Sequence, residues 1–594
     1  MNQPHYLAID FETSYVKESR DIGSLGVHNY LRHPETKIWL VSMSDNQGRK
    51  FTGKPKDAPW DWITPETTLL SHNRTFDSDV MAVLGLFATD VDYKDWICTS
   101  DTAAANQVPR ALKGACKVML GTKVDKDVRD KMSGKDPDTM TKEFWDECVE
   151  YAQADADNCL ALHGMLTPLS EHEHKASLHT SRMCHRGIGI DEVKLNSYID
   201  SVKISLFELQ QLVPWFGSLD SKGKEIPLLS PHAVARECSK LGIPAPESMA
   251  KDSPEFDNWC EQHSKTAPFV EALGKIRSCN RVLTVLEAMK ARTSGGRLYY
   301  GLKYFGAQHT GRWSGDNGLN MQNLPRKEMF GVDLRSLLIP KPGHVFVSAD
   351  YSQIEARVLP WLAGDTALLE LLRQGMDIYE AHARTTMGYT DPRPLKEVDP
   401  ALRQMSKVRI LGLSFGLGAT TLVNYAKTAA GVTLSVQQAK KIVNDYRATN
   451  RPVVNVWNLL GGEMRRTMIQ NRGEDMNVKL PSGRTIKYFN VHEDQGMRAS
   501  KIQGESPLWW TPGALAENIT QGTARDILSH AVVKLEEAGI PVVLHVHDEV
   551  LCEVPLDVAE EACQTVKRIM EDLPDWCAGL PLNADPKVIN CYTK

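Results

Sequence analysis

The sequence predicts an α/β domain at the N-terminus, followed by a larger α+β domain that a helical segment interrupts. Apolar strand-like runs alternate with helical patterns up to about residue 171, and helical patterns dominate from about 172 to 300. Two strand-like segments, HVFVSAD and PVVLHVHDEVLCEVP, then flank a mainly helical stretch from about residue 362 to 510. We therefore expect two main units, residues 1–171 and residues 172–594.

Length and composition are those of a large folded protein. At 594 residues the chain is too long for one core, since domains usually hold about 100 to 200 residues. The 42% hydrophobic and 24% charged residues exclude a disordered, collagen-like or coiled-coil protein. No apolar run reaches the roughly 18 to 20 residues of a bilayer span, and no signal-peptide pattern opens the chain, so we expect a cytoplasmic protein without a membrane partner.

The twelve cysteines are scattered, without a CxxC pair or regular spacing. In so long a chain this distribution is typical of reduced, mostly buried thiols. We expect neither disulfides nor a zinc site.

Charge is distributed unevenly along the chain. Residues 1–171 hold 19 Lys and Arg against 27 Asp and Glu, a formal charge of −8, which leaves +2 for the rest of a chain whose total is −6. An acidic first unit argues against a basic coat over the whole protein, so we expect any nucleic acid to bind in grooves where basic residues gather. The alternative, that the asymmetry is only solvated surface, stays open.

Four acidic residues in the first unit form one candidate metal site. Asp10 and Glu12 end the apolar run YLAIDFET, and side chains two residues apart on a strand share a face. Asp77 comes from SHNRTFDSDV, and Asp155 follows Tyr151 by four residues, which places both on one helical face. Hydrolysis of a phosphodiester by two divalent metals requires such oxygen ligands. A single DxE pair is more often a cap or an ion-pair partner, but acids from three separate segments favour a metal site.

Two more acids follow strand-like segments in the second unit. HVFVSAD ends at Asp350, with Ser352 as the expected cap of the helix that follows. The two apolar runs of PVVLHVHDEVLCEVP flank His547, Asp548 and Glu549, so that a hairpin turn would lift Asp548 out of the sheet. Acids that meet at the ends of antiparallel strands would form a second two-metal site, suited to joining a nucleotide.

A basic helical segment lies between these two motifs. In LRQMSKVRILGLSFGLG, four residues recur at intervals of four, namely Arg403, Lys407, Leu411 and Phe415. On one helical face, two cations followed by two apolar groups would hold a triphosphate at one end and stack against a base at the other. The alternative is an amphipathic helix with a solvated basic edge.

The motifs of the first unit, DFET, NRTFD and YxxxD in this order, resemble the proofreading 3′–5′ exonucleases whose last motif contains tyrosine, which have an RNase H-like fold. The resemblance covers about the first 170 residues. It implies that two metal ions are held by Asp10, Glu12, Asp77 and Asp155. It also implies that Tyr151 orients the attacking water, and that Asn73 and Phe76 support the frayed primer end.

The second unit resembles family A DNA polymerases, because its three segments are similar to motifs A, B and C of that family. Further matches follow in order: TGRWSGDNGLNMQNLPR, LPSGR and ENITQGTARD. The resemblance runs from about residue 172 onward and implies a right hand. We expect a thumb at about 190–300, a palm at about 301–361 and 511–594, and fingers at about 362–510.

The same resemblance implies roles for individual residues. Two Mg²⁺ ions, or Mn²⁺ in their place, would be bound at Asp350, Tyr351 and Asp548. The incoming nucleotide would meet Arg403, Lys407, Leu411, Phe415, Gln353, Tyr351 and Glu355, of which Lys407 is also a candidate catalytic residue and Glu355 would crowd the 2′ position. DNA near the nascent pair would contact Arg312, Asn323, Gln521 and His547.

Three positions depart from the family pattern. Leu411 stands where an aromatic residue is usual, which affects base stacking and dideoxynucleotide discrimination, and Phe415 stands where tyrosine is usual. Without that hydroxyl, we expect Glu355 to exclude ribonucleotides by bulk and not as a tethered carboxylate. Tyr379 replaces a residue that is often histidine; the alternative is a packing aromatic.

Together these features predict a template-directed DNA polymerase with proofreading, of the compact replicative type found in phages. We expect it to act as a monomer on primer-template DNA and deoxynucleoside triphosphates, in the host cytoplasm if a phage encodes it. We expect no 5′-nuclease domain and, because the helical region is short, no thioredoxin-type processivity partner. The alternatives are an exonuclease with a DNA-holding C-terminal domain and a silent DNA scaffold, which would not need both sets of acids.

Overall fold

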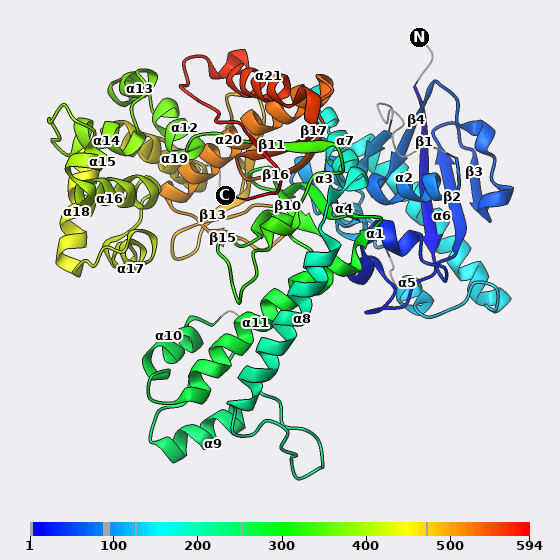
Figure 1. The fold of residues 1–594 in the computed structure, drawn as a ribbon. Coiled ribbons are helices and arrows are strands. Elements are labelled where there is room, and N and C mark those ends of the chain that lie inside the picture. The colour runs from blue at the N-terminus through cyan, green and yellow to red at the C-terminus, as the bar shows by residue number, and fades with distance from the viewer. Residues whose placement is uncertain (1–3, 87–95, 125–126, 251–252, 471–472, 594) are drawn as a thin grey trace.

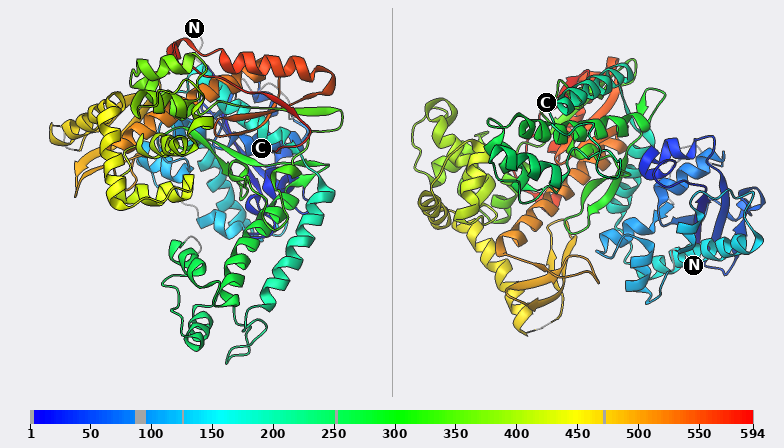
Figure 2. Two further views of the ribbon diagram at one scale, coloured as in Figure 1. Left: turned by 60° about the vertical axis from the view of Figure 1, so that its left-hand side comes forward. Right: turned by 90° about the horizontal axis from the view of Figure 1, so that it is seen from below.

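The computed structural model describes residues 4–86, 96–124, 127–250, 253–470 and 473–593. Figure 1 shows an N-terminal module at one end, a central palm, fingers at the other end, and a helical thumb that projects from the middle. The right-hand view of Figure 2, from below, shows the same order, with the N-terminal module and the fingers on opposite sides of the palm. Among the described residues, no helix combines the length and the apolar character needed to cross a bilayer.

The N-terminal module is built on a five-stranded mixed sheet of order β3-β2-β1-β4-β5. Strands β1, β4 and β5 are parallel, whereas β2 and β3 are antiparallel to their neighbours. The strands are β1 (His5–Thr13), β2 (Ile38–Asp45), β3 (Lys50–Gly53), β4 (Thr67–Ser71) and β5 (Trp96–Cys98). This order and mixed direction are those of an RNase H-like α/β fold, as the sequence predicts.

Helices cover this sheet and carry part of the first candidate site. They are α1 (Ile22–Leu31), α2 (Arg74–Val83), α3 (Thr99–Ala105), α4 (Leu112–Met119), α5 (Asp127–Met132) and α6 (Lys142–Met165). Thr141 caps α6 by accepting a hydrogen bond from the Phe144 N–H. The predicted four-residue spacing of Tyr151 and Asp155 therefore falls within one continuous helix, which packs against β1 and β2.

Helix α7 (Glu171–Arg186) leads from this module into the rest of the chain, and the thumb follows it. The thumb helices are α8 (Glu192–Gln211), α9 (Pro231–Leu241), α10 (Pro254–His263) and α11 (Pro268–Ala291). The two long helices α8 and α11 pack together, and a separate apolar core around Trp215, Phe256 and Phe269 holds the tip. Short strands β6 (Ile188–Gly189), β7 (Thr293–Ser294) and β8 (Arg297–Leu298) close its base.

The palm is a four-stranded antiparallel sheet of order β16-β17-β11-β18. Its strands are β11 (His344–Asp350), β16 (Val542–Val546), β17 (Glu549–Pro555) and β18 (Lys587–Ile589). Helices α20 (Pro512–Glu537) and α21 (Ala559–Glu571) pack against it, and the hairpin of β9 (Gly301–Ala307) and β10 (Arg312–Asp316) lies beside it. The predicted hairpin turn is present, with His547 at φ 57° between β16 and β17.

The fingers are mainly helical, as the sequence predicts, but they end in a small sheet that it does not predict. After α12 (Ile354–Leu362) of the palm, they contain α13 (Thr366–Arg373), α14 (Ile378–Thr386), α15 (Leu395–Val398), α16 (Pro400–Val408), α17 (Ala419–Ala430), α18 (Val436–Thr449) and α19 (Arg451–Gln470). A four-stranded sheet then follows, made of β12 (Met476–Lys479), β13 (Thr485–Glu493), β14 (Met497–Ser500) and β15 (Leu508–Trp509). These strands are short and separated by turns, so their periodicity is weak in the sequence.

Two local predictions in this region are wrong. Ser352 does not cap α12, because the N-cap position is Gln353 in the left-handed conformation at φ 52°, without a side-chain cap hydrogen bond. The residues spaced by four from Arg403 do not share one α-helical face, because α16 ends at Val408 and a π-helical turn (Arg409–Leu413) follows. The wider π turn breaks the 3.6-residue period, and Phe415 lies in the turn beyond it.

Candidate active sites

Three of the predicted acids of the N-terminal module converge on one point. Asp10 and Glu12 come from β1 and Asp155 from α6, and each offers a carboxylate oxygen within 4.8 Å of the others. The β1 alternation places the first two on one face of the sheet, and α6 brings the third across it. A group of carboxylate oxygens at this spacing suits a hard divalent cation such as Mg²⁺.

Asp77 lines the same cavity, of about 730 Å³, but is not within that group of three. Its carboxyl is buried in the first turn of α2, and burial raises its pKa, with the Glu12 charge adding to the effect. Its Oδ1 atom is buried without a hydrogen-bond partner among the described residues. A buried, unsatisfied carboxylate oxygen that faces other acids fits a site that takes up a cation.

Three further predicted residues lie around this cavity. Burial, together with the Asp155 charge, raises the pKa of Tyr151, so its phenol stays protonated at neutral pH. Asn73 is the N-cap residue of α2, and Phe76 follows in its first turn. Arg129 of α5 also lines the cavity, and the Tyr15 hydroxyl donates to its carbonyl oxygen at 2.5 Å. The sequence motifs missed Arg129, because no spacing connects it with the acids.

The two predicted acids of the palm are brought together by strand pairing. Asp350, the last residue of β11, lies opposite Glu549 at the start of β17. The next backbone N–H, that of Tyr351, donates to the carbonyl oxygen of Asp548 at 3.1 Å. The residues at 350 and 548 are therefore neighbours at one end of the palm sheet.

Glu549 has two hydrogen-bond partners beside this strand end. Its carboxylate accepts hydrogen bonds from the Ser348 hydroxyl at 2.7 Å and from the Tyr592 hydroxyl at 2.9 Å. It is 3% exposed. These bonds stabilise the buried carboxylate of the residue that lies opposite Asp350.

A second cavity, of about 200 Å³, adjoins Asp548. Several predicted DNA and nucleotide contacts line it, namely Arg312, Gln353, Glu355, Leu411, Gln521 and His547. Arg312 connects two of them: its Nη2 donates to His547 Nδ1 at 3.1 Å, and its Nη1 lies 3.6 Å from the Glu355 carboxylate. Glu355 therefore has a charged partner in the palm, in place of the hydroxyl that residue 415 lacks.

The other nucleotide candidates lie outside this cavity. Arg403 pairs with Asp377 at 3.4 Å, and its guanidinium lies 5.0 Å from the centre of the Tyr379 ring. Tyr379 is buried, so its packing role is present in the structure. Lys407 is half-buried on α16, and Phe415 packs against the apolar core of the fingers. Asn323 is exposed at the end of a short 3₁₀ turn.

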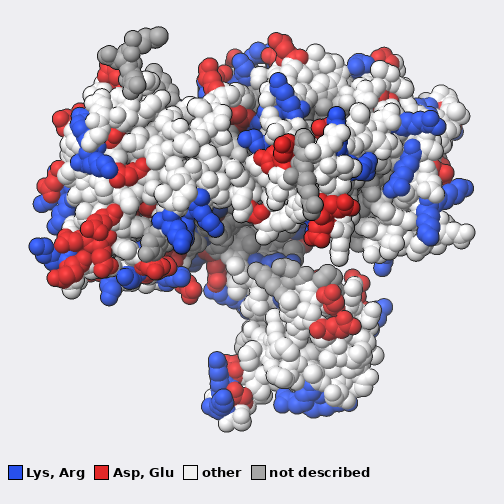
Figure 3. Space-filling model, turned by 180° about the vertical axis from the view of Figure 1, so that it is seen from behind, with Lys and Arg blue, Asp and Glu red and all other residues white. Residues whose placement is uncertain are grey.

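Figure 3 shows the charge distribution from behind. Acidic side chains gather over the lower part of the N-terminal module at the left, and Lys and Arg side chains lie over the fingers at the upper right. This arrangement agrees with the acidic charge of residues 1–171.

Comparison of the sequence with protein-family models identifies the family of this chain. The sequence model of DNA polymerase family A matches residues 220–593, which is more than half of the chain. The chain belongs to DNA polymerase family A.

Curated relatives of this family A polymerase include a phage enzyme. The DNA polymerase of Bacillus phage SP02 is 26% identical over 670 aligned positions, covering 99% of both chains. DNA polymerase I of Pseudomonas aeruginosa is 28% identical over 59% of this chain and 37% of its own length. The thermostable DNA polymerase I of Thermus aquaticus is 30% identical over 47% of this chain and 30% of its own length.

A solved structure shares the fold. The POL domain of Pol1 from M. smegmatis, in complex with DNA primer-template and dNTP, superposes with a TM-score of 0.68 at 19% identity. The match covers 99% of this chain and 95% of that one. The right-hand architecture with an N-terminal α/β module is thus common to both.

Three buried polar residues of the polymerase palm were missed by the sequence motifs. Gln322, His545 and Arg525 line the cavity beside Asp548. Both ring nitrogens of His545 lack a hydrogen-bond partner among the described residues, and burial, with the Arg525 charge, lowers its pKa to about 3. The sequence could have indicated Gln322 and Arg525, because they lie in the TGRWSGDNGLNMQNLPR and ENITQGTARD matches.

Proposed function

We propose that this polymerase extends a primer 3′ end by two-metal phosphoryl transfer, directed by a template, and that its N-terminal module removes misincorporated nucleotides in the 3′–5′ direction. The observation that carries the proposal is the strand pairing that makes Asp350 and Asp548 neighbours at one end of the palm sheet. The full-length similarity to a phage DNA polymerase supports a replicative role in a phage.

We propose the following domain limits. Residues 1–171 would form the exonuclease and 172–594 the polymerase, with the thumb at about 190–300. The palm would be formed by about 301–361 and 511–594. The fingers would be about 362–510, including the sheet β12–β15.

In the polymerase site, Asp350 and Asp548 would hold two Mg²⁺ ions beside the Tyr351 backbone. Bound Mg²⁺ supplies Lewis acidity, which lowers the pKa of the primer 3′-hydroxyl and neutralises charge on the α-phosphate. Arg312, Gln521 and His547 would contact the minor-groove edge of the nascent pair, where acceptors are common to all correct pairs. Glu355, paired with Arg312, would occupy the space beside the sugar 2′ position.

Residues of the fingers would bind the incoming nucleotide. Arg403 would exchange its Asp377 partner for phosphate oxygens, and Lys407 would add a second cation one helical turn later. Leu411, 40% exposed beside the palm cavity, would pack against the base without an aromatic stack.

In the exonuclease site, Asp10, Glu12, Asp77 and Asp155 would hold the ions, and the Tyr151 phenol would orient the attacking water. That water oxygen bonds to the terminal phosphorus as the bond to O3′ breaks, and the water proton passes to O3′. The products are a nucleoside 5′-monophosphate and a strand with a new 3′-hydroxyl. Asn73 and Phe76 would hold the frayed end.

Primer extension with Mg²⁺ and four deoxynucleotides tests both activities in one assay. The parent is compared with Asp548→Ala and Asp10→Ala on the same labelled primer, with and without nucleotides. We expect extension to disappear only in Asp548→Ala and degradation to disappear only in Asp10→Ala. Degradation without extension in the parent would instead favour an exonuclease with a DNA-holding C-terminal domain.

A further inference from the structure

The first turn of α2 carries three candidate residues of the exonuclease site, Asn73, Phe76 and Asp77. The same turn is attached to α7, which begins at the proposed boundary of the module and continues beyond it. The Thr75 hydroxyl lies 2.8 Å from the Ser181 hydroxyl, and a ring nitrogen of His185 donates to the Thr75 carbonyl oxygen at 2.9 Å. One side of this turn therefore faces the acids while the other is fixed to a helix outside the module.

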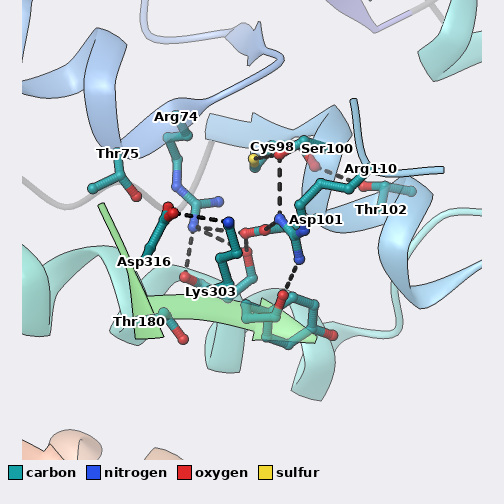
Figure 4. Close-up of polar contacts among 12 residues, drawn as sticks. Arg74, Thr75, Cys98, Ser100, Asp101, Thr102, Arg110, Thr180, Lys303 and Asp316 are labelled. Atoms are coloured by element: carbon teal, nitrogen blue, oxygen red, sulfur yellow. Dashed lines mark hydrogen bonds and ion pairs between the residues drawn. The ribbon is translucent and has the colours of Figure 1, made fainter. Parts of the chain in front are cut away.

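Arg74 provides the strongest part of this attachment (Figure 4). It opens α2, is 1% exposed, and is among the largest fully buried side chains of the chain. Its Nη2 donates to the Ser177 carbonyl oxygen at 2.6 Å, to the Ser177 hydroxyl at 2.9 Å and to the Ser181 hydroxyl at 3.0 Å. A buried guanidinium persists only where its donors are satisfied, so these bonds fix α2 against α7.

The attachment reaches the strand side of Asp77 as well. Arg74 Nη1 donates to the Trp96 carbonyl oxygen at 3.2 Å, and the Trp96 indole donates to the Ser71 hydroxyl at 3.0 Å. Ser71, at the end of β4, is the polar side chain that most offsets the rise in the Asp77 pKa caused by burial. The residues that surround Asp77 are thus held by a network whose centre is Arg74.

Helix α7 is itself fixed to the palm. Glu173 pairs with Arg525 of α20 at 2.5 Å, and Arg186 pairs with Glu536 of the same helix at 2.7 Å. Side-chain placement in a metal site must hold to about 0.5 Å, so the rigidity of such supports affects the chemistry directly.

We propose that Arg74, together with Ser177 and Ser181 of α7, positions Asp77 for metal binding, so that the exonuclease site depends on a helix that belongs to the polymerase side of the chain. This inference rests on the exonuclease activity proposed above. Arg74 acts through the first turn of α2 and is a positioning residue, since its donors bond to α7 and β5 and its guanidinium pairs with Asp101 of α3 at 3.8 Å.

The test uses the full-length chain with a Ser177→Ala/Ser181→Ala double variant and, separately, Arg74→Met. Degradation of single-stranded DNA is measured over a range of Mg²⁺ concentrations, and primer extension reports on overall folding. We expect degradation at low Mg²⁺ to fall about tenfold or more, with a nearly unchanged KM for DNA, and to recover partly at high Mg²⁺. Primer extension should remain within about twofold, because α20 keeps its own contacts with α7.

A binding measurement supplies a readout independent of turnover. Mn²⁺ is titrated into a chain whose polymerase site is silenced by Asp350→Ala/Asp548→Ala, with and without the serine substitutions. We expect the Mn²⁺ dissociation constant to rise about tenfold. Ser239→Ala is the matched control, because it removes a serine hydroxyl that donates to the Ala235 carbonyl oxygen within thumb helix α9 at 2.9 Å. Both readouts should stay within about twofold.

The outcomes separate the two proposals. Absence of degradation in the parent would overturn the proposed exonuclease. If the parent degrades DNA normally, and the serine and Arg74 variants match the parent in degradation rate and in Mn²⁺ binding, only the positioning role would be overturned. A parallel loss of extension and degradation that Mg²⁺ does not rescue would also overturn it, since that pattern means general destabilisation.

Discussion

The backbone N–H of Tyr351 donates a hydrogen bond of 3.1 Å to the carbonyl oxygen of Asp548. This bond extends the antiparallel pairing in which Asp350 lies opposite Glu549. Backbone pairing of two strands that are about 200 residues apart in sequence thus fixes both acids at one sheet end. Two carboxylates at the same strand ends would repel each other until a cation binds between them, so we predict that this arrangement favours cation binding at the expense of stability.

Asp350→Asn should separate these two effects. We expect primer extension to fall by about 10³ or more, because the variant removes a charged metal ligand. In EDTA the melting temperature of the variant should be about 1 to 2 °C above that of the parent, because the repulsion between the two carboxylates is gone. The increase in melting temperature on adding Mg²⁺ should be smaller in the variant than in the parent. Differential scanning fluorimetry with and without Mg²⁺ measures both. Asp557→Asn, at an exposed position after β17, is the control and should change neither.

Glu355 tests how the sugar is selected. Its carboxylate lies 3.6 Å from Arg312, so its position does not depend on residue 415. We expect Glu355→Ala to raise ribonucleotide incorporation about 10²-fold, whereas Glu355→Gln, which keeps the bulk, should stay within about tenfold of the parent. Single-nucleotide insertion with matched ribo- and deoxynucleotides gives the ratio. Equal discrimination against ribonucleotides in Glu355→Ala and in the parent would contradict the role of Glu355 in excluding them. If Glu355→Gln incorporates ribonucleotides as readily as Glu355→Ala, charge and not bulk selects the sugar.

The sequence predicts those parts of the sites that local periodicity defines. Asp10 and Glu12 share a strand face, and Tyr151 and Asp155 share a helix face, because each pair lies within one regular element. The hairpin turn at His547 is equally local, since two apolar runs flank it. The same reasoning fails at Phe415. It assumes a continuous α-helix from Arg403 to Phe415, but the α-helical repeat ends where the π turn begins.

Residues whose role depends on distant partners could not be found in this way. Arg74 stands inside the NRTFD motif as an ordinary helical residue, and only the fold brings Ser177 and Ser181 to it. His545 looks like one more polar residue in a strand, but the fold buries it against Trp313. The sheet β12–β15 was missed because its strands are short and its register is set by partners across turns.

The Glu173–Arg525 pair between α7 and α20 should govern acid stability. Burial alone would raise the pKa of Glu173, but the Arg525 guanidinium outweighs it and, with the Tyr304 hydroxyl, lowers that pKa to about 2. The folded pKa lies below the ordinary value of 4.5, so the pair contributes stability that is present above pH 4.5 and is lost as the pH falls toward 2. We expect Glu173→Gln to lower the free energy of unfolding at pH 7 by about 3 kcal/mol.

Urea denaturation of the parent and Glu173→Gln between pH 3 and pH 7 checks this expectation. The difference between the two midpoints should narrow as the pH falls below about 4.5. Glu171→Gln removes an exposed carboxylate that pairs with Lys175 on the same helix and should leave the midpoint unchanged at every pH. A constant difference across this range would contradict the role of Glu173 ionisation.

His545 should add a second loss of stability in acid, which begins at a higher pH than the loss governed by Glu173. Its ring is fully buried in β16, 4.6 Å from the Trp313 ring, and burial, followed by the Arg525 and His547 charges, lowers its pKa to about 3 from an ordinary 6.5. Below pH 6.5 the unfolded chain takes up a proton that the folded chain does not, so stability is lost as the pH falls from 6.5 toward 3. We expect His545→Gln to reduce this loss by about 2 kcal/mol at pH 5. Urea midpoints at pH 5 and pH 8 measure this difference. The control His232→Gln changes an exposed histidine and should have the midpoints of the parent at both pH values. An equal pH dependence in the parent and in His545→Gln would mean that the buried ring does not cause the loss of stability between pH 8 and pH 5.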